Sequence, residues 1–121
     1  GDANHALALL FSDEIAGHYA LVTTNYVMDE LYTLLLLNIG YKRTISYKQQ
    51  LDILVQEGIL EIEWISEQLA VEAWAIFEQF NNDKQWSFTD CTSYVVMKRL
   101  GITEVFAFDR HFGQMGFIRR P

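Results

Sequence analysis

Apolar residues along this chain recur with two different periods, and segments of the two kinds alternate. An apolar residue at every third or fourth position predicts helices over residues 3–18, 25–38, 44–57, 66–80 and 87–100. Short β-prone or alternating runs predict strands over residues 20–23, 59–65, 104–108 and 117–120. Strands that alternate with helices indicate a three-layer α/β/α fold, in which helices cover both faces of a mainly parallel sheet.

Three of these elements carry further information. The helix over 25–38 is apolar on nearly every side and contains the run Leu34–Leu37, so it is either buried on most sides or carries a second interface. The segment Leu60–Trp64 alternates strictly between apolar and acidic residues, which predicts a half-exposed edge strand. The helix over 44–57 has Ile45, Leu51, Ile53, Leu54 and Val55 as its apolar set.

The helix that starts at Ser87 organises the candidate chemistry. Ser87 is a good N-cap residue, Asp90 follows three residues later as in a capping box, and Gly101 ends the helix. A strand over Glu104–Phe108 follows and is succeeded directly by Asp109. Ligand sites in open α/β sheets gather at the carboxyl ends of the strands, so we predict that Asp90 and Asp109 lie at one edge.

Glu30 is a third acid in an unusual position, because it shares a helix face with Val27, Leu34 and Leu37. A carboxylate on an apolar face is rarely fully buried unless it is paired or binds a metal. Each acid also has a purely structural interpretation. Glu30 could reach water at the rim, Asp90 could only stabilise its helix start, and Asp109 could cap a short turn.

We predict that Glu30, Asp90 and Asp109 meet and hold a hard divalent cation. Carboxylates without His or Cys partners suit Mg²⁺ or Mn²⁺. Such an ion activates water and neutralises the charge that develops on a phosphodiester. Arg110, beside Asp109, is the best candidate for a phosphate contact, although it could also be a solvated turn charge.

Composition limits the possible partners and compartment. The 121 residues suggest a single domain over 1–121, and the net charge of −7 excludes nucleic-acid binding by bulk electrostatics, so any RNA contact must be local or assisted. A lone cysteine, Cys91, cannot form an internal disulfide and fits a reducing compartment. The apolar run Leu34–Leu37 is far shorter than a membrane span, and no signal peptide is visible, so we expect a cytoplasmic protein.

Three segments of the sequence resemble the PIN domain family, in particular the PIN-type toxins of bacterial toxin–antitoxin pairs. They read VTTNYVMDEL at 22–31, SFTDCTSYVVM at 87–97 and VFAFDRHFGQMGF at 105–117. Glu30, Asp90 and Asp109 fall where the family keeps its second, third and fourth acids. The resemblance implies a metal-dependent endoribonuclease with a parallel sheet, acids at its carboxyl edge and a cognate antitoxin. Ser87 would then assist through its hydroxyl or backbone, and Arg110 would touch RNA.

The sequence departs from the family at its start. The family opens with a strand that ends in its first acid, and nothing here matches that strand, because residue 1 already lies past it. We therefore expect a PIN-like chain without the N-terminal strand. Loss of a central strand exposes backbone edges and apolar helix faces, so we expect a homodimer, with or without swapped strands, or a sheet rearranged to close the gap.

Two alternatives to the nuclease remain open. The chain could be a catalytically inactive PIN-fold module that binds RNA or a protein partner, which the acidic charge and the missing strand favour. A phosphoacceptor domain of the receiver type also uses clustered acids with Mg²⁺. That class should carry a Lys near the end of a late strand, where this sequence reads Phe106–Asp109, so it ranks third.

Overall fold

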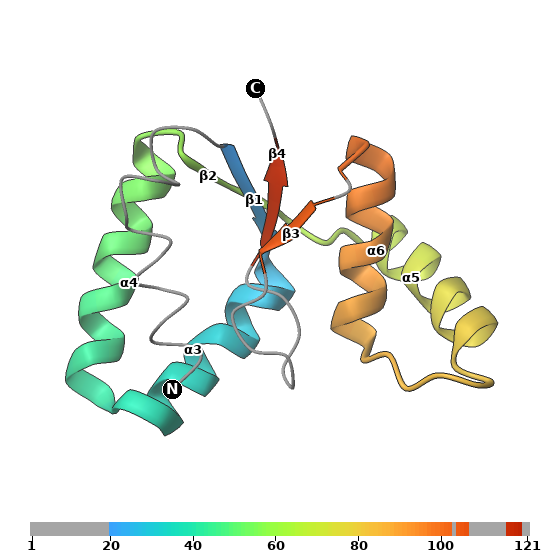
Figure 1. Cartoon of the computed structure of the whole chain (residues 1–121), viewed down its shortest axis with the longest axis horizontal. Coiled ribbons are helices and arrows are strands. Elements are labelled where there is room, and N and C mark those ends of the chain that lie inside the picture. Colours follow the sequence, from blue (N-terminus) through green and yellow to red (C-terminus); the bar gives the residue numbers. More distant parts are fainter. Residues whose placement is uncertain (1–19, 103, 107–115, 120–121) are drawn as a thin grey trace.

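The structure, a computed structural model, describes residues 20–102, 104–106 and 116–119 (Figure 1). The helix predicted over 3–18, together with Asp109 and Arg110, lies outside the described residues. The described strands are β1 (Ala20–Thr24), β2 (Leu60–Glu63), β3 (Glu104–Phe106) and β4 (Gly116–Arg119). The described helices are α3 (Asn25–Ile39), α4 (Tyr41–Gln56), α5 (Glu67–Phe80) and α6 (Phe88–Leu100).

The described strands form one sheet in the order β2-β1-β4-β3. β1 pairs with β2 in parallel, whereas β4 is antiparallel to both of its neighbours, β1 and β3. β1, β2 and β3 therefore share one direction, as the mainly parallel prediction requires, and β4 is the exception. The connection over residues 107–115 explains this exception, because it is shorter than the dozen or more residues that a parallel crossover needs.

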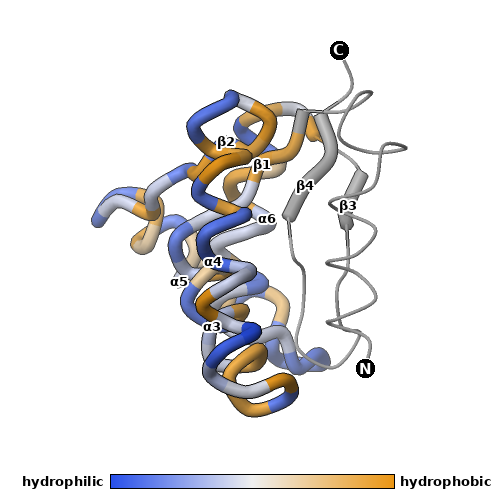
Figure 2. Tube along the Cα trace, turned by 90° about the vertical axis from the view of Figure 1, so that its left-hand side faces the viewer, coloured by the Kyte–Doolittle hydropathy of each residue, from blue (hydrophilic) through white to orange (hydrophobic). Residues whose placement is uncertain are grey.

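Helices cover the sheet on two sides, as expected for three layers. α4 lies on one side of the strands and α5 with α6 on the other, while α3 leaves the lower end of β1 (Figure 1). Hydrophobic residues mark β1 and β2 in Figure 2. β2 is at the edge of the sheet, which confirms the edge strand predicted from its alternating pattern. Within the described residues, no helix is long and apolar enough to cross a membrane.

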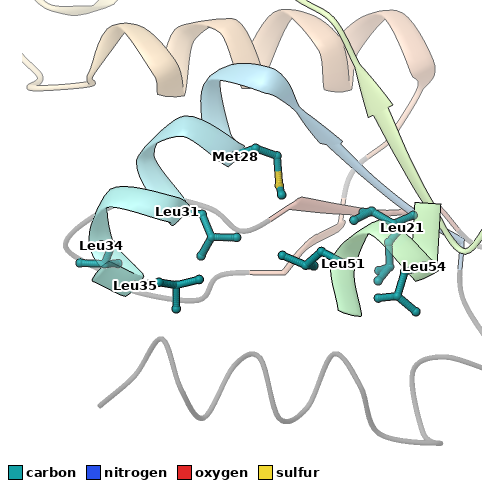
Figure 3. Close-up of a cluster of buried hydrophobic side chains, with 8 residues drawn as sticks. Leu21, Met28, Leu31, Leu34, Leu35, Leu51 and Leu54 are labelled. Atoms are coloured by element: carbon teal, nitrogen blue, oxygen red, sulfur yellow. The ribbon is translucent and has the colours of Figure 1, made fainter. Parts of the chain in front are cut away.

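The two faces of β1 bury different clusters, because successive strand residues point to opposite sides. Leu21 joins a cluster with α3 and α4, in which Leu31 and Leu51 are almost fully buried (Figure 3). Val22 joins a second cluster with Val96 of α6. These clusters fix α3 on one side of β1 and α6 on the other, and so determine where the side chains of the two helices meet.

The apolar residues of two helices are divided between core and surface. α4 buries Leu51 and Leu54, and Tyr47 packs partly buried against the same core cluster. Ile45, Ile53 and Val55 of α4 are 43%, 51% and 38% exposed. The run Leu34–Leu37 is divided in the same way: Leu34 and Leu35 are buried, whereas Leu36 and Leu37 are exposed.

The ends of α3 and α6 follow the sequence signals. The Thr24 hydroxyl oxygen accepts a hydrogen bond from the Val27 amide at 3.1 Å, which starts α3 directly at the carboxyl end of β1. Gly101 ends α6 in the left-handed region with φ of 68°, where a residue without a Cβ is favoured. α3 is thereby placed at the sheet edge where the parallel strands end.

Candidate metal centre

The start of α6 is held by a reciprocal pair of hydrogen bonds. The Ser87 Oγ accepts from the Asp90 amide at 3.0 Å, and the Asp90 Oδ2 accepts from the Ser87 amide at 3.2 Å. This is the capping box that the sequence predicted. It fixes the Asp90 carboxylate through Oδ2, and no described residue is seen to donate a hydrogen bond to Oδ1. The structural role of Asp90 is therefore real, and it leaves one oxygen for a further ligand.

α3 carries Glu30 to the same place from the other side. The ring of Tyr26, one turn before Glu30, lies 6.2 Å from the ring of Phe88, which follows Ser87 directly. Burial raises the pKa of the Glu30 carboxyl group, a hydrogen bond from the Thr89 side chain partly opposes this, and the negative charges of Asp90 and Asp29 raise it further. Two helices that are distant in sequence therefore bring Glu30 and Asp90 into electrostatic contact.

Both acids open into one cavity of about 560 Å³ between α3 and the segment that precedes α6. Its lining consists of Asp29, Glu30, Thr33, Leu34, Leu37, Asn38, Gln85, Ser87 and Asp90. The structure thus brings together three predicted site residues, Glu30, Ser87 and Asp90. Their function as metal ligands or substrate contacts stays a prediction.

The remaining two predicted site residues, Asp109 and Arg110, lie outside the described residues. The strand that precedes them, β3, runs in the same direction as β1, so Phe106 ends at the edge of the sheet from which α3 starts. Among the described residues, no group of three or more His, Cys, Asp and Glu side chains could hold a metal ion. A complete site therefore needs at least one ligand beyond Glu30 and Asp90.

The chemistry of the pair fits a hard cation. Carboxylate oxygens are the ligands that Mg²⁺ and Mn²⁺ prefer, and the described lining contains no Lys, Arg or His that would neutralise the acids. Burial raises the pKa of the Glu30 carboxyl group, and repulsion by the negative charges of Asp90 and Asp29 raises it further. A divalent ion would remove this repulsion.

The sequence reasoning missed several cavity residues. Asp29 is exposed and also lines the cavity. Thr33 and Asn38 follow Glu30 along α3 at helical spacing, so the helical wheel could have found them. Gln85 lies in the segment before α6, where no periodicity predicts side-chain direction. Only the tertiary structure places Gln85 opposite α3.

The sequence matches the PIN domain over residues 1–118, so the chain belongs to the PIN domain family. It is similar to the 23S rRNA-specific endonuclease VapC20 of Mycobacterium tuberculosis, from strains CDC 1551 / Oshkosh and ATCC 25618 / H37Rv. With each it shares 28% identity over 123 residues, which covers 100% of this chain and 88% of the relative.

The fold is also similar to the crystal structure of Mycobacterium tuberculosis VapC20, described there as a sarcin-ricin loop cleaving toxin. The TM-score is 0.68 at 28% identity, covering 100% of this chain and 88% of that one. The family and the fold class predicted from the sequence are thereby confirmed.

Proposed function

We propose that this chain is a Mg²⁺- or Mn²⁺-dependent endoribonuclease of the PIN type and the toxin of a toxin–antitoxin pair. The observation that carries the proposal is the convergence of Glu30 and Asp90 from α3 and α6 in one cavity, where burial raises the pKa of Glu30 and the charge of Asp90 raises it further. The similarity to VapC20, a 23S rRNA-specific endonuclease, supports RNA as the substrate. Ribosomal RNA is accordingly the first substrate to test.

In this proposal Glu30, Asp90 and Asp109 hold the ion. When bound, the ion supplies a water of lowered pKa and neutralises charge on the phosphodiester. Ser87 keeps the Asp90 carboxylate in place through its amide, while its hydroxyl hydrogen can be donated to a substrate oxygen. Arg110 contacts an RNA phosphate, because a guanidinium group pairs with phosphate in two parallel hydrogen bonds.

The proposal extends to the partners of this single PIN-like domain. A cognate antitoxin would hold the toxin inactive in the cytoplasm. A homodimer, with or without an exchanged strand, would cover apolar side chains that the described fold leaves exposed, such as Leu36 at 50% and Tyr41 at 70% exposure. Protein–protein contact through these residues would leave the cavity open to RNA.

A second candidate function has one observation in its favour. Asp29, Glu30 and Asp90 line the cavity, but no group of three or more described side chains could hold a metal ion, and the net charge is −7. A PIN-fold module that binds RNA or protein without cleaving it would show these features. Such a module would gain no thermal stability from Mn²⁺, whereas a metal-binding nuclease would.

The direct test is cleavage of 23S rRNA by the purified chain with Mn²⁺ or Mg²⁺. We expect EDTA and Asp90→Asn each to abolish cleavage, since each removes the ion or a ligand. Asp83→Asn is the matched control, because Asp83 is an exposed acid in the turn before α6 and does not line the cavity. Cleavage that survives both EDTA and Asp90→Asn would contradict the proposal.

A further inference from the structure

We propose that a second copy of this chain binds at the corner between α3 and α4, and that its Lys42 and Arg43 complete the cavity of the first copy. These two cations would bind the RNA phosphates that flank the cleaved bond. The inference rests on the proposed ribonuclease function and deepens it, because each active site would then need a residue pair from the partner subunit.

The corner between α3 and α4, which lies below the strands in Figure 1, carries large apolar side chains that the fold leaves exposed. Leu36 and Leu37, in the last turn of α3, are 50% and 78% exposed. Tyr41 and Ile45, one turn apart at the start of α4, are 70% and 43% exposed. Exposed apolar patches mark interaction surfaces, and two copies related by a twofold axis can bury one such patch against itself.

The backbone of this corner is held by three hydrogen bonds at Gly40. The Gly40 amide donates to the Leu36 carbonyl oxygen at 3.2 Å. The Gly40 carbonyl oxygen accepts from the amide and the hydroxyl group of Thr44, at 3.1 Å and 2.7 Å. With φ of 83°, where a residue without a Cβ is favoured, Gly40 lets α4 begin directly after α3. The apolar patch is therefore preorganised, which lowers the entropy cost of binding a partner.

The apolar patch is continuous with the cavity through Leu37. This side chain belongs to the exposed patch and also lines the cavity, as does its neighbour Asn38. A second copy seated on the patch therefore borders the cavity. In a twofold interface each contact occurs twice, so the patch of one subunit faces the patch of the other. Lys42 and Arg43 directly follow Tyr41 of the patch, and this places the partner's cations at the rim of the cavity.

The charges of the cavity and of the corner are complementary. Three acids, Asp29, Glu30 and Asp90, line the cavity, and its described lining contains no Lys, Arg or His. RNA carries a negative charge on every phosphate, so a wall that holds only acids repels the phosphates around the cleaved bond. Lys42 and Arg43 are exposed, and no described residue is seen to form an ion pair with either. The partner's cations would remove the repulsion that the cavity alone imposes.

The position of Lys42 and Arg43 in their own helix also favours an external anion. Both lie in the first turn of α4, which contains no acidic residue and has no side-chain cap. The start of a helix carries partial positive charge, so cations there are unfavourable unless an anion lies nearby. A local preference that is broken in this way is expected at functional sites. The helix start and the two side chains together suit a phosphate group.

The first measurement is RNA cleavage by the double variant Lys42→Ala/Arg43→Ala. We expect its kcat/KM to fall about tenfold or more, since hydrogen bonds between charged groups are lost. Lys98→Ala/Arg99→Ala is the matched control, because it removes an adjacent Lys–Arg pair from the last turn of α6, outside the cavity. The control should cleave like wild type, and circular dichroism checks that both variants fold. Wild-type kcat/KM for Lys42→Ala/Arg43→Ala would overturn the inference.

A mixed dimer shows whether the cations act across the subunit interface. One subunit carries Lys42→Ala/Arg43→Ala, the other carries Asp90→Asn, and two different tags allow purification of the mixed species. Its one intact set of acids then faces the one intact pair of cations on the partner subunit. We expect about half of the wild-type activity, because one of the two equivalent sites is complete. Activity no higher than that of the Lys42→Ala/Arg43→Ala dimer would overturn the inference.

A cross-linking experiment separates this inference from the proposed function. If wild type cleaves no RNA, the nuclease is wrong, and the subunit contact is tested without activity. Asn38→Cys and Lys42→Cys chains that differ in tag length are mixed and treated with a short bis-maleimide reagent, while the native Cys91 is buried. A covalent heterodimer that Asn38→Cys does not form with Lys98→Cys would support the contact. Absence of this heterodimer, or a monomer mass in sedimentation equilibrium, would overturn it.

Discussion

Glu30 of α3 and Asp90 of α6 line one cavity, where burial raises the pKa of the Glu30 carboxyl group and the charge of Asp90 raises it further. Asp90 is also half of a capping box with Ser87, so its position is fixed by the helix start. The same carboxylate thus stabilises α6 locally and opposes the ionisation of Glu30 across the cavity. This combination is characteristic of functional sites, where charges of one sign are kept close together for a ligand.

Glu30→Gln should raise the melting temperature of the metal-free protein at pH 7. The pKa of Glu30 is higher in the folded than in the unfolded state, so ionisation of Glu30 at neutral pH disfavours folding. The stabilising effect of the neutral side chain should shrink as pH falls through the raised pKa. It should vanish below about pH 4, where Glu30 is protonated in both states. Thermal melts of both proteins with EDTA between pH 4 and 7 measure this, and a lower melting temperature for Glu30→Gln at pH 7 would contradict it.

Mn²⁺ should stabilise the wild-type protein and neither Glu30→Gln nor Asp90→Asn. A ligand that binds only the folded state at 100 times its Kd adds about 2.7 kcal/mol to the free energy of unfolding. The stabilisation should weaken as pH falls through the raised pKa of Glu30, because protons then compete with the ion. Differential scanning fluorimetry across Mn²⁺ concentrations gives the result. Equal shifts in wild type and both variants would place the ion elsewhere.

Ser87→Ala should reduce both stability and RNA cleavage. Loss of an N-cap hydroxyl costs about 1 kcal/mol, and here it also loosens the Asp90 carboxylate. Ser66→Ala is the matched control, because the Ser66 hydroxyl oxygen caps α5 by accepting from the Leu69 amide at 3.2 Å, outside the cavity. Urea unfolding should give similar losses for the two variants, whereas only Ser87→Ala should lower kcat. Equal activity of the two variants would reduce Ser87 to a helix cap.

Leu31→Ala should be the most destabilising of the single changes considered. Leu31 is fully buried in the cluster that joins α3 to β1 and α4, and a Leu→Ala change in such a core costs about 2–5 kcal/mol. Leu36→Ala, on the exposed side of the same helix, should cost well under 1 kcal/mol in a monomer. Urea unfolding at low protein concentration compares them. If Leu36→Ala strongly lowered the free energy of unfolding only at high protein concentration, this would indicate that Leu36 lies in a dimer interface.

Local signals in the sequence were reliable where a side chain forms a hydrogen bond with a backbone group a few residues away. Ser87 caps α6 as predicted, and Thr24 and Ser66 cap α3 and α5 in the same way, because an N-cap needs only residues two or three positions away. The start of α4 was placed three residues late, at 44 instead of Tyr41. No capping side chain marks that start, since Gly40 precedes it. The sequence therefore offered no signal to place it.

The burial of side chains on outer helices and the order of the strands were harder to predict from the sequence. Ile53 and Val55 look like core residues by composition, but α4 presents only one stripe to its neighbours. The position of β4 between β1 and β3 depends on pairing with strands far away in sequence. Neither the burial of α4 side chains nor the position of β4 follows from the local spacing of apolar residues.

The sequence by itself determined the alternation of helices and strands, the helix caps and the identity of the candidate acids, because each depends on residue types at short spacing. Only the tertiary structure decided that Glu30 and Asp90 share a cavity. Glu30 and Asp90 meet because β1 buries Leu21 on one face and Val22 on the other, and this packing places α3 next to α6. Such packing is a property of the whole folded chain and leaves no pattern in any single segment.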